Sequence, residues 1–441
     1  MPISPDPVTD DGPPSAEVDV AVIGGGIVGV SAAHWLARAG HRVALLEKGR
    51  VAGEQSGRNW GFVRQQGRDA AELPLARESL AMWHRLGNEI GADTGFRRSG
   101  VLYVTDRPDA AARWEAYVAR ARPLGIESRM ITPAEVREMI PGCARDWIAG
   151  LHTEADGRAE PAHAAPALAE AARRHGATIH QRCAARGLLV EGGRVAGVAT
   201  EHSVVRAGAV ILAAGAWSSL FLRQHGVTLP QLAVRATVLR TQPCESVLEG
   251  GLTTPDFSMR RRLDGGYSVA ISGRWTFDLV PDAIRWFRPF LPAFLQQRRN
   301  LRLRVGPRFV GAWRDARRRD IESPGPFEAT REWDPPPDPR VLRDGLARLG
   351  ATFPALSGTR MAEAWAGMID ITPDAVPVIG PVASLPGLTL ATGFSGHGFA
   401  LGPGAGRLAA ELATGGEPVV DPAPFRLDRL AAARIAREEL A

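Results

Sequence analysis

Lysine is almost absent from this sequence: Lys48 is the only one, and arginine supplies the other cations among 53 lysines and arginines. A mechanism that forms a Schiff base with a lysine away from position 48 is therefore excluded. Cysteine is also scarce, and Cys143, Cys183 and Cys244 form no CxxC pair. This usage is typical of a reducing cytoplasm and argues against a structural metal, so we assign no metal ligands.

Long apolar runs are missing too, since none approaches the roughly 18 residues that a membrane span needs. Residues 1–16 are rich in proline and aspartate and lack the basic and apolar regions of a signal peptide, so we predict a disordered tail there. The net charge of +5 is modest and no RNA- or DNA-binding motif occurs, so nucleic acid is not an expected partner. The length of 441 residues favours two domains.

A βαβ unit is predicted at the start of the chain. The apolar strand 18–23 leads into a glycine-rich turn, and apolar residues then recur at helical spacing over 27–40. A second strand follows over 42–46 and ends at Glu47. The G-x-G-x-x-G pattern of a dinucleotide-binding site is formed by Gly24, Gly26 and Gly29.

Each of these glycines has a steric role in such a site. Gly24 makes the tight turn, Gly26 lets the backbone approach a pyrophosphate, and Gly29 lets helix and strand pack closely. The pyrophosphate then sits on the helix N-terminus, at Ile27 and Val28, where free N–H groups and the macrodipole favour an anion.

At the end of the second strand, Glu47 is placed to accept a hydrogen bond from a ribose 2′-hydroxyl, with Lys48 beside it. Its carboxylate would repel a 2′-phosphate. FAD and NAD present the same ADP half, so this unit does not distinguish the two cofactors. No second unit of this kind exists for NAD(P)H, which favours electrons entering from an organic substrate.

Five further segments carry a resemblance. They are 54–61 (EQSGRNWG), 156–158 (DGR), 210–217 (VILAAGAW), 370–374 (DITPD) and 393–399 (GFSGHGF). Together with the βαβ unit they resemble the D-amino-acid-oxidase (DAO) family of FAD enzymes, which includes the glycine oxidase, sarcosine oxidase and D-amino-acid dehydrogenase group.

The resemblance implies an α/β fold: a Rossmann-type FAD-binding domain and a second, α+β substrate domain built on an antiparallel sheet. We place the FAD domain at 17–105, 152–230 and 346–430, and the substrate domain at 106–151 and 231–345. The turn 264–266 between two strand-like runs predicts a hairpin in the second domain. A final helix, Arg407 to Ala413, is expected to be opened by Gly402, Gly404 and Gly406.

The resemblance also implies the contacts of the flavin cofactor. Family members that tether FAD carry a cysteine where this chain has Gly367, so non-covalent FAD is expected. The cofactor shell inferred from the motifs adds Ser56, Arg58, Asn59, Trp60, Gly61, Ala214, Gly215, Trp217, Gly396, His397, Gly398 and Phe399.

The activity implied by the family is oxidation of a C–N bond in an amino acid or secondary amine. A hydride passes from carbon to flavin N5, and the imine product is hydrolysed. The protein anchors the substrate, so candidates are Arg64, Arg274, Tyr267 and His397, with Tyr103 as a further hydroxyl. Ala400 replaces a carboxylate-binding lysine of the family. With no lysine near the flavin, we expect a dehydrogenase rather than an oxidase.

Residues 285–319 mix eleven arginines with aromatic and aliphatic side chains and one acid, Asp315. Three interpretations stay open: contact with an anionic membrane surface, docking of an electron-accepting protein or quinone, or a packed helix with a basic face. Pro289 and Pro292 are expected to interrupt any long amphipathic helix. The protein is expected to be cytoplasmic, with peripheral binding at the inner membrane face under the first interpretation.

Two other functions remain open from the sequence. One is oxidation of a 2-hydroxy acid, in which an alcohol replaces the amine. The other is an FAD-carrying subunit that needs a partner for its chemistry.

Overall fold

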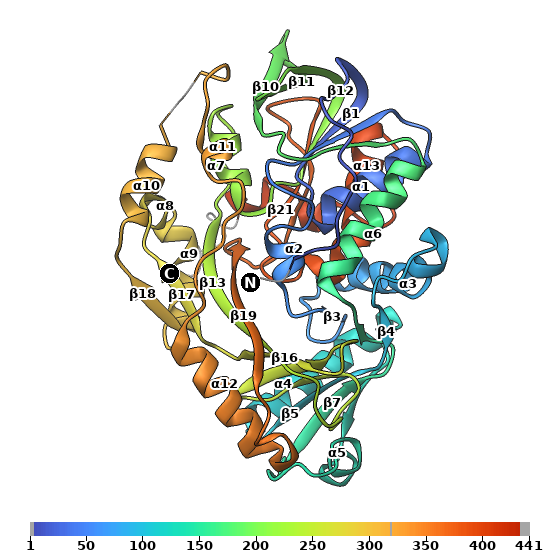
Figure 1. Ribbon diagram of the computed structural model, residues 1–441, viewed down its shortest axis with the longest axis vertical. Helices are drawn as coiled ribbons and strands as arrows, with labels where there is room; N and C mark the ends of the chain where they lie inside the picture. Colours follow the sequence, from blue (N-terminus) through green and yellow to red (C-terminus); the bar gives the residue numbers. More distant parts are fainter. Residues whose placement is uncertain (1–3, 318–319, 433–441) are drawn as a thin grey trace.

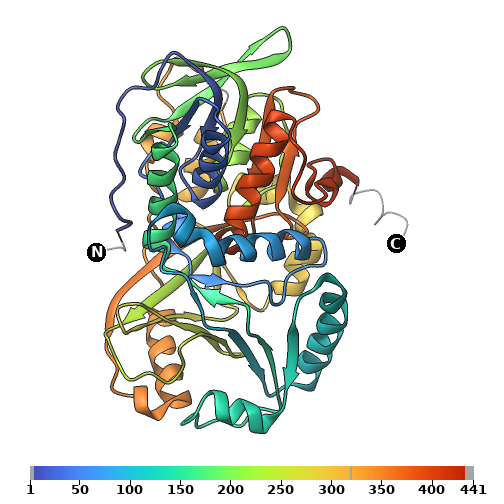
Figure 2. The same ribbon diagram turned by 90° about the vertical axis from the view of Figure 1, so that its right-hand side faces the viewer.

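The computed structural model describes residues 4–317 and 320–432. Figures 1 and 2 show two lobes, one around the N-terminal βαβ unit and one around a large, strongly bent sheet. Within the described ranges, no helix has the length and apolar character needed to cross a membrane.

The first lobe is built on a sheet with the order β10-β11-β12-β1-β2-β9. β1 (Glu17–Ile23) pairs in parallel with both β2 (Val43–Leu46) and β12 (Val204–Leu212), and the C-terminal ends of all three strands lie at one edge. Helices on both faces bury the C-terminal halves of these strands, which explains the apolar runs there. The remaining strands are β9 (Thr178–His180), β10 (Ala185–Glu191), β11 (Arg194–Thr200), β20 (Val378–Pro381) and β21 (Leu388–Thr392).

Helices α1 (Ile27–Arg38) and α6 (Pro161–Arg174) pack on this sheet together with the last long helix, α13 (Figure 1). α13 runs over Gly398–Thr414, so the prediction that it starts at Arg407 is wrong. Its glycines lie inside the helix because α1 crosses it closely. A Cβ on Gly406 would meet the Ser31 Cβ at 2.4 Å.

The second lobe is built on a ten-stranded sheet. The longest strand pairing in this sheet is the antiparallel one between β13 (Leu232–Thr241) and β19 (Met361–Ile371). The predicted hairpin is confirmed as β15 (Phe257–Arg261) and β16 (Tyr267–Ile271), and α12 (Pro339–Thr352) covers this part of the sheet. The other strands are β5 (Val101–Thr105), β6 (Ser128–Ile131), β7 (Ala149–Thr153), β14 (Gly251–Thr253), β17 (Trp275–Asp278) and β18 (Leu301–Arg304).

The two-domain division stays a proposal, and its boundaries need adjustment at two strands. β5 and β19 lie within segments assigned to the FAD domain, yet both pair in the large sheet. β3 (Phe62–Val63), β4 (Arg97–Arg98) and β8 (Gly157–Arg158) form a small third sheet. Further helices are α2 (Gln55–Arg58), α3 (Leu73–Ile90), α4 (Pro108–Ala121), α5 (Pro133–Met139), α7 (Ser218–Arg223), α11 (Pro326–Ala329) and α14 (Arg429–Ala432).

The predicted disordered tail is wrong for the described residues that precede β1. Asp11 pairs with Arg173 at 2.6 Å and accepts a hydrogen bond from the Ile179 backbone at 2.8 Å. The segment therefore lies along α6 and β9. Composition favoured disorder because it cannot reveal that the aspartates have fixed partners.

Of the basic segment, residues 318 and 319 lie outside the described ranges; with the residues just before it, the rest forms three short helices and a strand at one side of the molecule: α8 (Pro281–Arg285), α9 (Phe287–Gln297), β18 and α10 (Arg308–Asp315) (Figure 1). α9 continues through Pro289 and Pro292, so the expected interruption at these prolines is wrong. Pro289 lies in the first turn, where helical N–H groups have no intrahelical partner. Phe290 is the only buried residue described in these three helices.

Candidate active site

The glycine turn after β1 has no room for side chains. Gly24 has φ +109°, and a Cβ on Gly29 would lie 1.9 Å from the Gly24 carbonyl oxygen. A Cβ on Gly24 itself would meet the Ala213 carbonyl oxygen at 2.4 Å, where β12 ends. The N-terminus of α1 follows this turn, and Ser56 Oγ accepts a hydrogen bond from its first N–H group, that of Ile27, at 2.8 Å. The N–H groups that follow in the first turn have no intrahelical partner, and such groups suit a bound anion.

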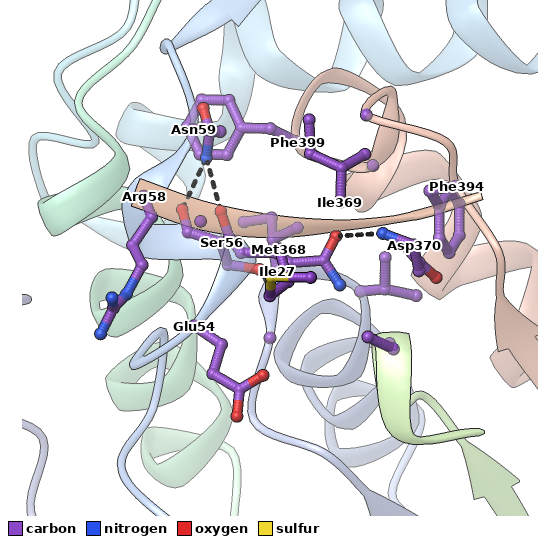
Figure 3. A pocket seen from close by; sticks show the side chains of 18 of the residues that line it. Ile27, Glu54, Ser56, Arg58, Asn59, Met368, Ile369, Asp370, Phe394 and Phe399 are labelled. Atoms are coloured by element: carbon purple, nitrogen blue, oxygen red, sulfur yellow. Dashed lines mark hydrogen bonds between the residues drawn. The ribbon is translucent and has the colours of Figure 1, made fainter. Parts of the chain in front are cut away.

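A cavity of about 540 Å³ extends from this turn to the start of α13. It is lined by the ends of β1, β2 and β12, the loop 54–61, the middle of β19 and the loop 393–398 (Figure 3). Most predicted cofactor contacts line it. They are Gly24, Gly26, Ile27, Val28, Glu47, Lys48, Ser56, Arg58, Asn59, Trp60, Gly61, Ala214, Gly215, Trp217, Gly367, Gly396, His397, Gly398 and Phe399.

At one end of the cavity, the Glu47 carboxylate accepts hydrogen bonds from the N–H groups of Gly25 and Gly49, each at 2.7 Å. Burial raises the pKa of Glu47, while Lys48 and these two N–H groups oppose the rise. Lys48 is fully engaged: its Nζ bonds Glu54 at 2.7 Å and lies 4.2 Å from the centre of the Trp217 ring. The only lysine of the chain thus belongs to this end.

The loop 54–61 is a rigid wall of the cavity. Asn59 Nδ2 donates to the Ser56 carbonyl oxygen at 2.7 Å, and Gly61 N donates to Asn59 Oδ1 at 2.7 Å. Figure 3 shows Asn59 folded back on this loop. Arg58 is buried, and its guanidinium donates to the Gly53 and Ala366 carbonyl oxygens and pairs with Asp334. Asn59 and Arg58 therefore shape the wall through backbone contacts.

At the opposite end, His397, whose side chain is 23% exposed, pairs with the buried Glu72, with 2.9 Å between Nδ1 and Oε1. Burial and the nearby Arg68 lower the pKa of His397 to about 4, so the imidazole is neutral and Nδ1–H donates. Burial of Glu72 raises its pKa, but the hydrogen bond from His397 and the charge of Arg68 outweigh this, and the net shift is downward. Glu72 is therefore ionised and fixes the ring against the start of α13.

Two arginines enter the cavity from the loop that follows β3, residues 64–68, which we call the arginine loop. Arg68 is 6% exposed, and its Nη1 atom is buried with no hydrogen-bond partner. Burial and the neighbouring Arg64 lower the pKa of Arg68 to about 10, so it stays cationic at neutral pH. Arg64 is half-buried and lies over Tyr103, 5.6 Å from the ring centre. Both guanidiniums and Tyr103 line the cavity.

Sequence reasoning missed Arg68. The signal was present, because Arg68 is four residues beyond Arg64 in a short loop that contains Gly67. What the sequence does not reveal is burial: Arg68 lacks a partner for Nη1, whereas Arg64 donates to the Gln66 carbonyl oxygen.

Two predicted substrate anchors do not line the cavity. Tyr267 is fully buried in β16, and its hydroxyl bonds the backbone of residues 247 and 248. Arg274 points outward and pairs with Asp344, although its neighbours Gly273 and Trp275 do line the cavity. Both predictions are therefore wrong. Arg274 lies in the turn between β16 and β17, and its side chain pairs with Asp344 on α12, whereas Tyr267 belongs to the core of the large sheet.

Asp370 links β19 to the loop that carries His397. The carboxylate is buried and accepts hydrogen bonds from Gly393 N and Gln231 Nε2, each at 2.9 Å. Burial raises the pKa of Asp370, against these hydrogen bonds. The DITPD motif therefore positions the loop, while Gly367, Met368 and Ile369 present the strand to the cavity (Figure 3).

These features fit a flavin dinucleotide. The turn at Gly24, the free N–H groups of α1 and the Glu47 carboxylate match the ADP half. The cavity continues past Gly215 to the neutral His397 and the start of α13, which leaves room beyond the ADP half for a ring system. The fold and site thus define a dinucleotide-dependent oxidoreductase of the flavin type.

Comparison with known proteins agrees with this class. Residues 19–412 match the family described as "DAO: FAD dependent oxidoreductase", and the chain belongs to this family. Glycine oxidase from Pseudomonas aeruginosa is 27% identical over 92% of this chain and 97% of its own length. The formaldehyde-forming 4-methylaminobutanoate oxidase of Paenarthrobacter nicotinovorans is 27% identical over 96% of this chain, which spans only 46% of that protein.

Among solved structures, L-amino acid deaminase from Proteus myxofaciens in complex with anthranilate superposes with a TM-score of 0.92. The two chains share 30% identity, and the match covers 96% of each. L-proline dehydrogenase from P. horikoshii gives a TM-score of 0.79 at 24% identity, a likeness of fold.

Proposed function

We propose that this protein is an FAD-dependent dehydrogenase that oxidises the C–N bond of an amino acid bearing a carboxylate next to the amine. The observation that carries this proposal is Arg68, a buried guanidinium in the cavity with an unpartnered Nη1. A buried charge without a partner is costly, so its place in a cavity points to an anionic ligand. Arg64 beside it offers a second set of donors for the same carboxylate.

In this proposal the two arginines hold the substrate carboxylate, and the rest of the cavity places the Cα–H bond. Ala236, Val238, Trp275 and Met368 supply an apolar lining that excludes water from the reacting carbon. FAD, when bound, accepts the hydride from carbon. The substrate nitrogen loses a proton, and water then converts the imine to an oxo acid and an amine.

His397 contributes as a neutral acceptor through Nε2, since its single N–H, on Nδ1, is committed to Glu72. A neutral ring is suited to a hydrogen bond with the substrate or the cofactor. It does not supply a fixed positive charge there.

FAD is proposed to be held without a covalent bond. None of the three cysteines lines the cavity, and the position of the tethering cysteine in other family members is Gly367. Release of free FAD on acid denaturation would support this. Flavin that stays with the unfolded chain would contradict it.

A screen under anaerobic conditions tests the proposed reaction. We expect bleaching of the bound flavin by at least one amino acid or N-methyl amino acid, and none by 2-hydroxy acids. The two arginines would also hold the carboxylate of a 2-hydroxy acid. If only 2-hydroxy acids reduce the flavin, the protein oxidises 2-hydroxy acids and this proposal is replaced. If no substrate works until a co-purified protein is added, the chain is a subunit of a larger enzyme.

We also propose that the basic segment contacts an anionic membrane surface, where a quinone would accept the electrons. Most of the exposed large apolar side chains described in the structure lie there, with Val305 78% and Ile284 73% exposed. The proposed contact face is made of exposed side chains of α8–α10, β18 and the residues between them: Ile284, Phe287, Leu295, Leu303, Val305, Phe309, Val310, Trp313, Arg285, Arg288, Arg298, Arg299, Arg302 and Arg304. Apolar side chains among arginines are what an interfacial segment needs.

Vesicle sedimentation tests this contact. The protein is expected to bind phosphatidylglycerol vesicles more tightly than phosphatidylcholine vesicles, with weaker binding at high salt. Replacing Phe287 and Trp313 by serine should abolish binding. The matched control is Val204→Ser, which removes a 48% exposed side chain from β12 in the other lobe. Equal binding by the double variant would assign this face to a protein partner or to none.

A further inference from the structure

A buried carboxylate, Asp156, lies beneath the arginine loop. Its side chain is fully buried, with Oδ1 accepting a hydrogen bond from Gln65 N at 2.9 Å and Oδ2 from Gln66 N at 3.1 Å. The backbone of Asp156 is fixed as well, because its carbonyl oxygen accepts from the N–H groups of Ser99 and Gly100. Asp156 therefore ties the arginine loop to the start of β5.

The loop also receives two hydrogen bonds from uncharged side chains. The Tyr117 hydroxyl on α4 donates to the Gln65 carbonyl oxygen at 3.1 Å, and Thr153 Oγ1 donates to Gln66 Oε1 at 2.7 Å. Among the described residues, none forms an ion pair with the Asp156 carboxylate, and its hydrogen bonds come from the two N–H groups of Gln65 and Gln66.

The charged and titratable groups around Asp156 are few. Arg64 and Arg68 face it from the loop itself, and Tyr117 faces it from α4. Glu72 on α3 and Tyr103 on β5 act on Arg68 from the cavity side. The carboxylate touches the loop backbone directly and the guanidiniums only at longer range, so its main effect is on the position of the loop.

We infer that Asp156 is a positioning residue for substrate binding: its ionised carboxylate holds the arginine loop through two backbone N–H groups, and protonation releases one of them. This inference rests on the proposed function, since the loop is taken to hold a substrate carboxylate. In a protonated carboxyl, one oxygen carries the proton and donates it, so only the other oxygen remains a strong acceptor. The loop then loses one of the two hydrogen bonds that hold it.

The direction of the pH dependence follows from burial. Burial raises the pKa of Asp156 to about 7, against the two N–H groups of the loop. Above this pH the carboxylate accepts both hydrogen bonds from the loop, and below it one of them is lost. The KM for a carboxylate substrate should therefore fall as the pH rises through about 7.

The test compares the holoenzyme with its Asp156→Asn variant at pH 6 and pH 8. At pH 8 we expect KM to rise about tenfold in the variant, as for loss of a hydrogen bond to a charged group, with kcat changed less than about threefold. At pH 6 the two proteins should differ by less than about threefold. The control is Glu154→Gln, a nearby acid with an 80% exposed side chain, which should leave KM unchanged. An unchanged KM at pH 8, or an equal rise at both pH values, would overturn the inference.

Two readouts need no turnover. The Kd of benzoate, followed by the absorption of the bound flavin, should show the same pattern with pH. A carboxyl whose pKa is about 7 when folded and about 4 when unfolded destabilises the fold as pH rises between these values. Asp156→Asn should therefore gain in Tm relative to the natural protein on going from pH 5 to pH 8. No relative gain would show that Asp156 does not titrate there, whether or not an amino acid is the substrate.

Discussion

Replacing Arg68 by methionine removes the charge that the proposed site is built around while keeping a long apolar stem. Truncating one partner of a buried charge pair costs about 2–5 kcal/mol. Arg64 still offers donors to the same carboxylate, so we expect the lower part of this range, about 2–3 kcal/mol. At about 1.4 kcal/mol per tenfold change, kcat/KM should fall about 30- to 150-fold.

The stability of this variant should move in the other direction. In the free enzyme Arg68 is a buried cation whose Nη1 has no partner, so its loss removes a cost of burial. We expect an unchanged or raised Tm and full FAD content. If the substitution damaged the fold, both the Tm and the FAD content would fall.

The assay is the rate of anaerobic flavin reduction over a range of substrate concentrations. Arg274→Met is the matched control, because Arg274 pairs with Asp344 outside the cavity and exposed ion pairs contribute about 0–1 kcal/mol. Its kcat/KM should change less than about threefold. If Arg68→Met keeps its kcat/KM, or if Arg274→Met loses as much, the assignment of the carboxylate site is refuted.

Three further predictions concern the cofactor and the fold. Glu47→Ala should weaken FAD binding by about 1–3 kcal/mol, measured by titration of the apoprotein; unchanged affinity would remove Glu47 from the ribose site. Gly406→Ala should lower the stability by about 1–3 kcal/mol, because its Cβ would meet Ser31 at 2.4 Å, while Gly311→Ala, with nothing within 4 Å, should be neutral or stabilising in a thermal melt. Reduced enzyme should react more slowly with oxygen than with a quinone in stopped-flow mixing, since Lys48 is held at the Glu47 end, His397 is neutral, and the charges of Arg64 and Arg68 are assigned to the carboxylate of the bound substrate or product; faster oxygen reaction would make the protein an oxidase.

The parts of the structure that depend on local pattern were predictable from the sequence. The glycine turn, both flanking strands and the hairpin around 264–266 follow from short-range rules of turn and strand chemistry. The start of α13 was not predictable in this way. Its glycines resemble a loop, and the close approach of α1 at Gly402 and Gly406 and of α3 at Gly404 explains them.

The substrate side of the site was harder to predict for a physical reason. Tyr267 and Arg274 were chosen from their place on and just after one strand-like run, yet Tyr267 packs in the core and Arg274, in the turn that follows β16, pairs with Asp344 outside the cavity. Arg68 and Asp156 matter through burial and through the absence or presence of partners. Burial and hydrogen-bond partners are decided when segments far apart in the sequence pack together, so the pattern within one segment does not reveal them.

The central claim is that the cavity oxidises a C–N bond next to a carboxylate. It is tested most directly by mixing the holoenzyme anaerobically with a matched set of compounds: an amino acid that reduces it, the amine left by removal of its carboxylate, and the corresponding 2-hydroxy acid. We expect rapid bleaching of the flavin by the amino acid and little or none by the amine or the 2-hydroxy acid. Equal bleaching by the amine would contradict the carboxylate site, and bleaching by the hydroxy acid alone would contradict C–N oxidation.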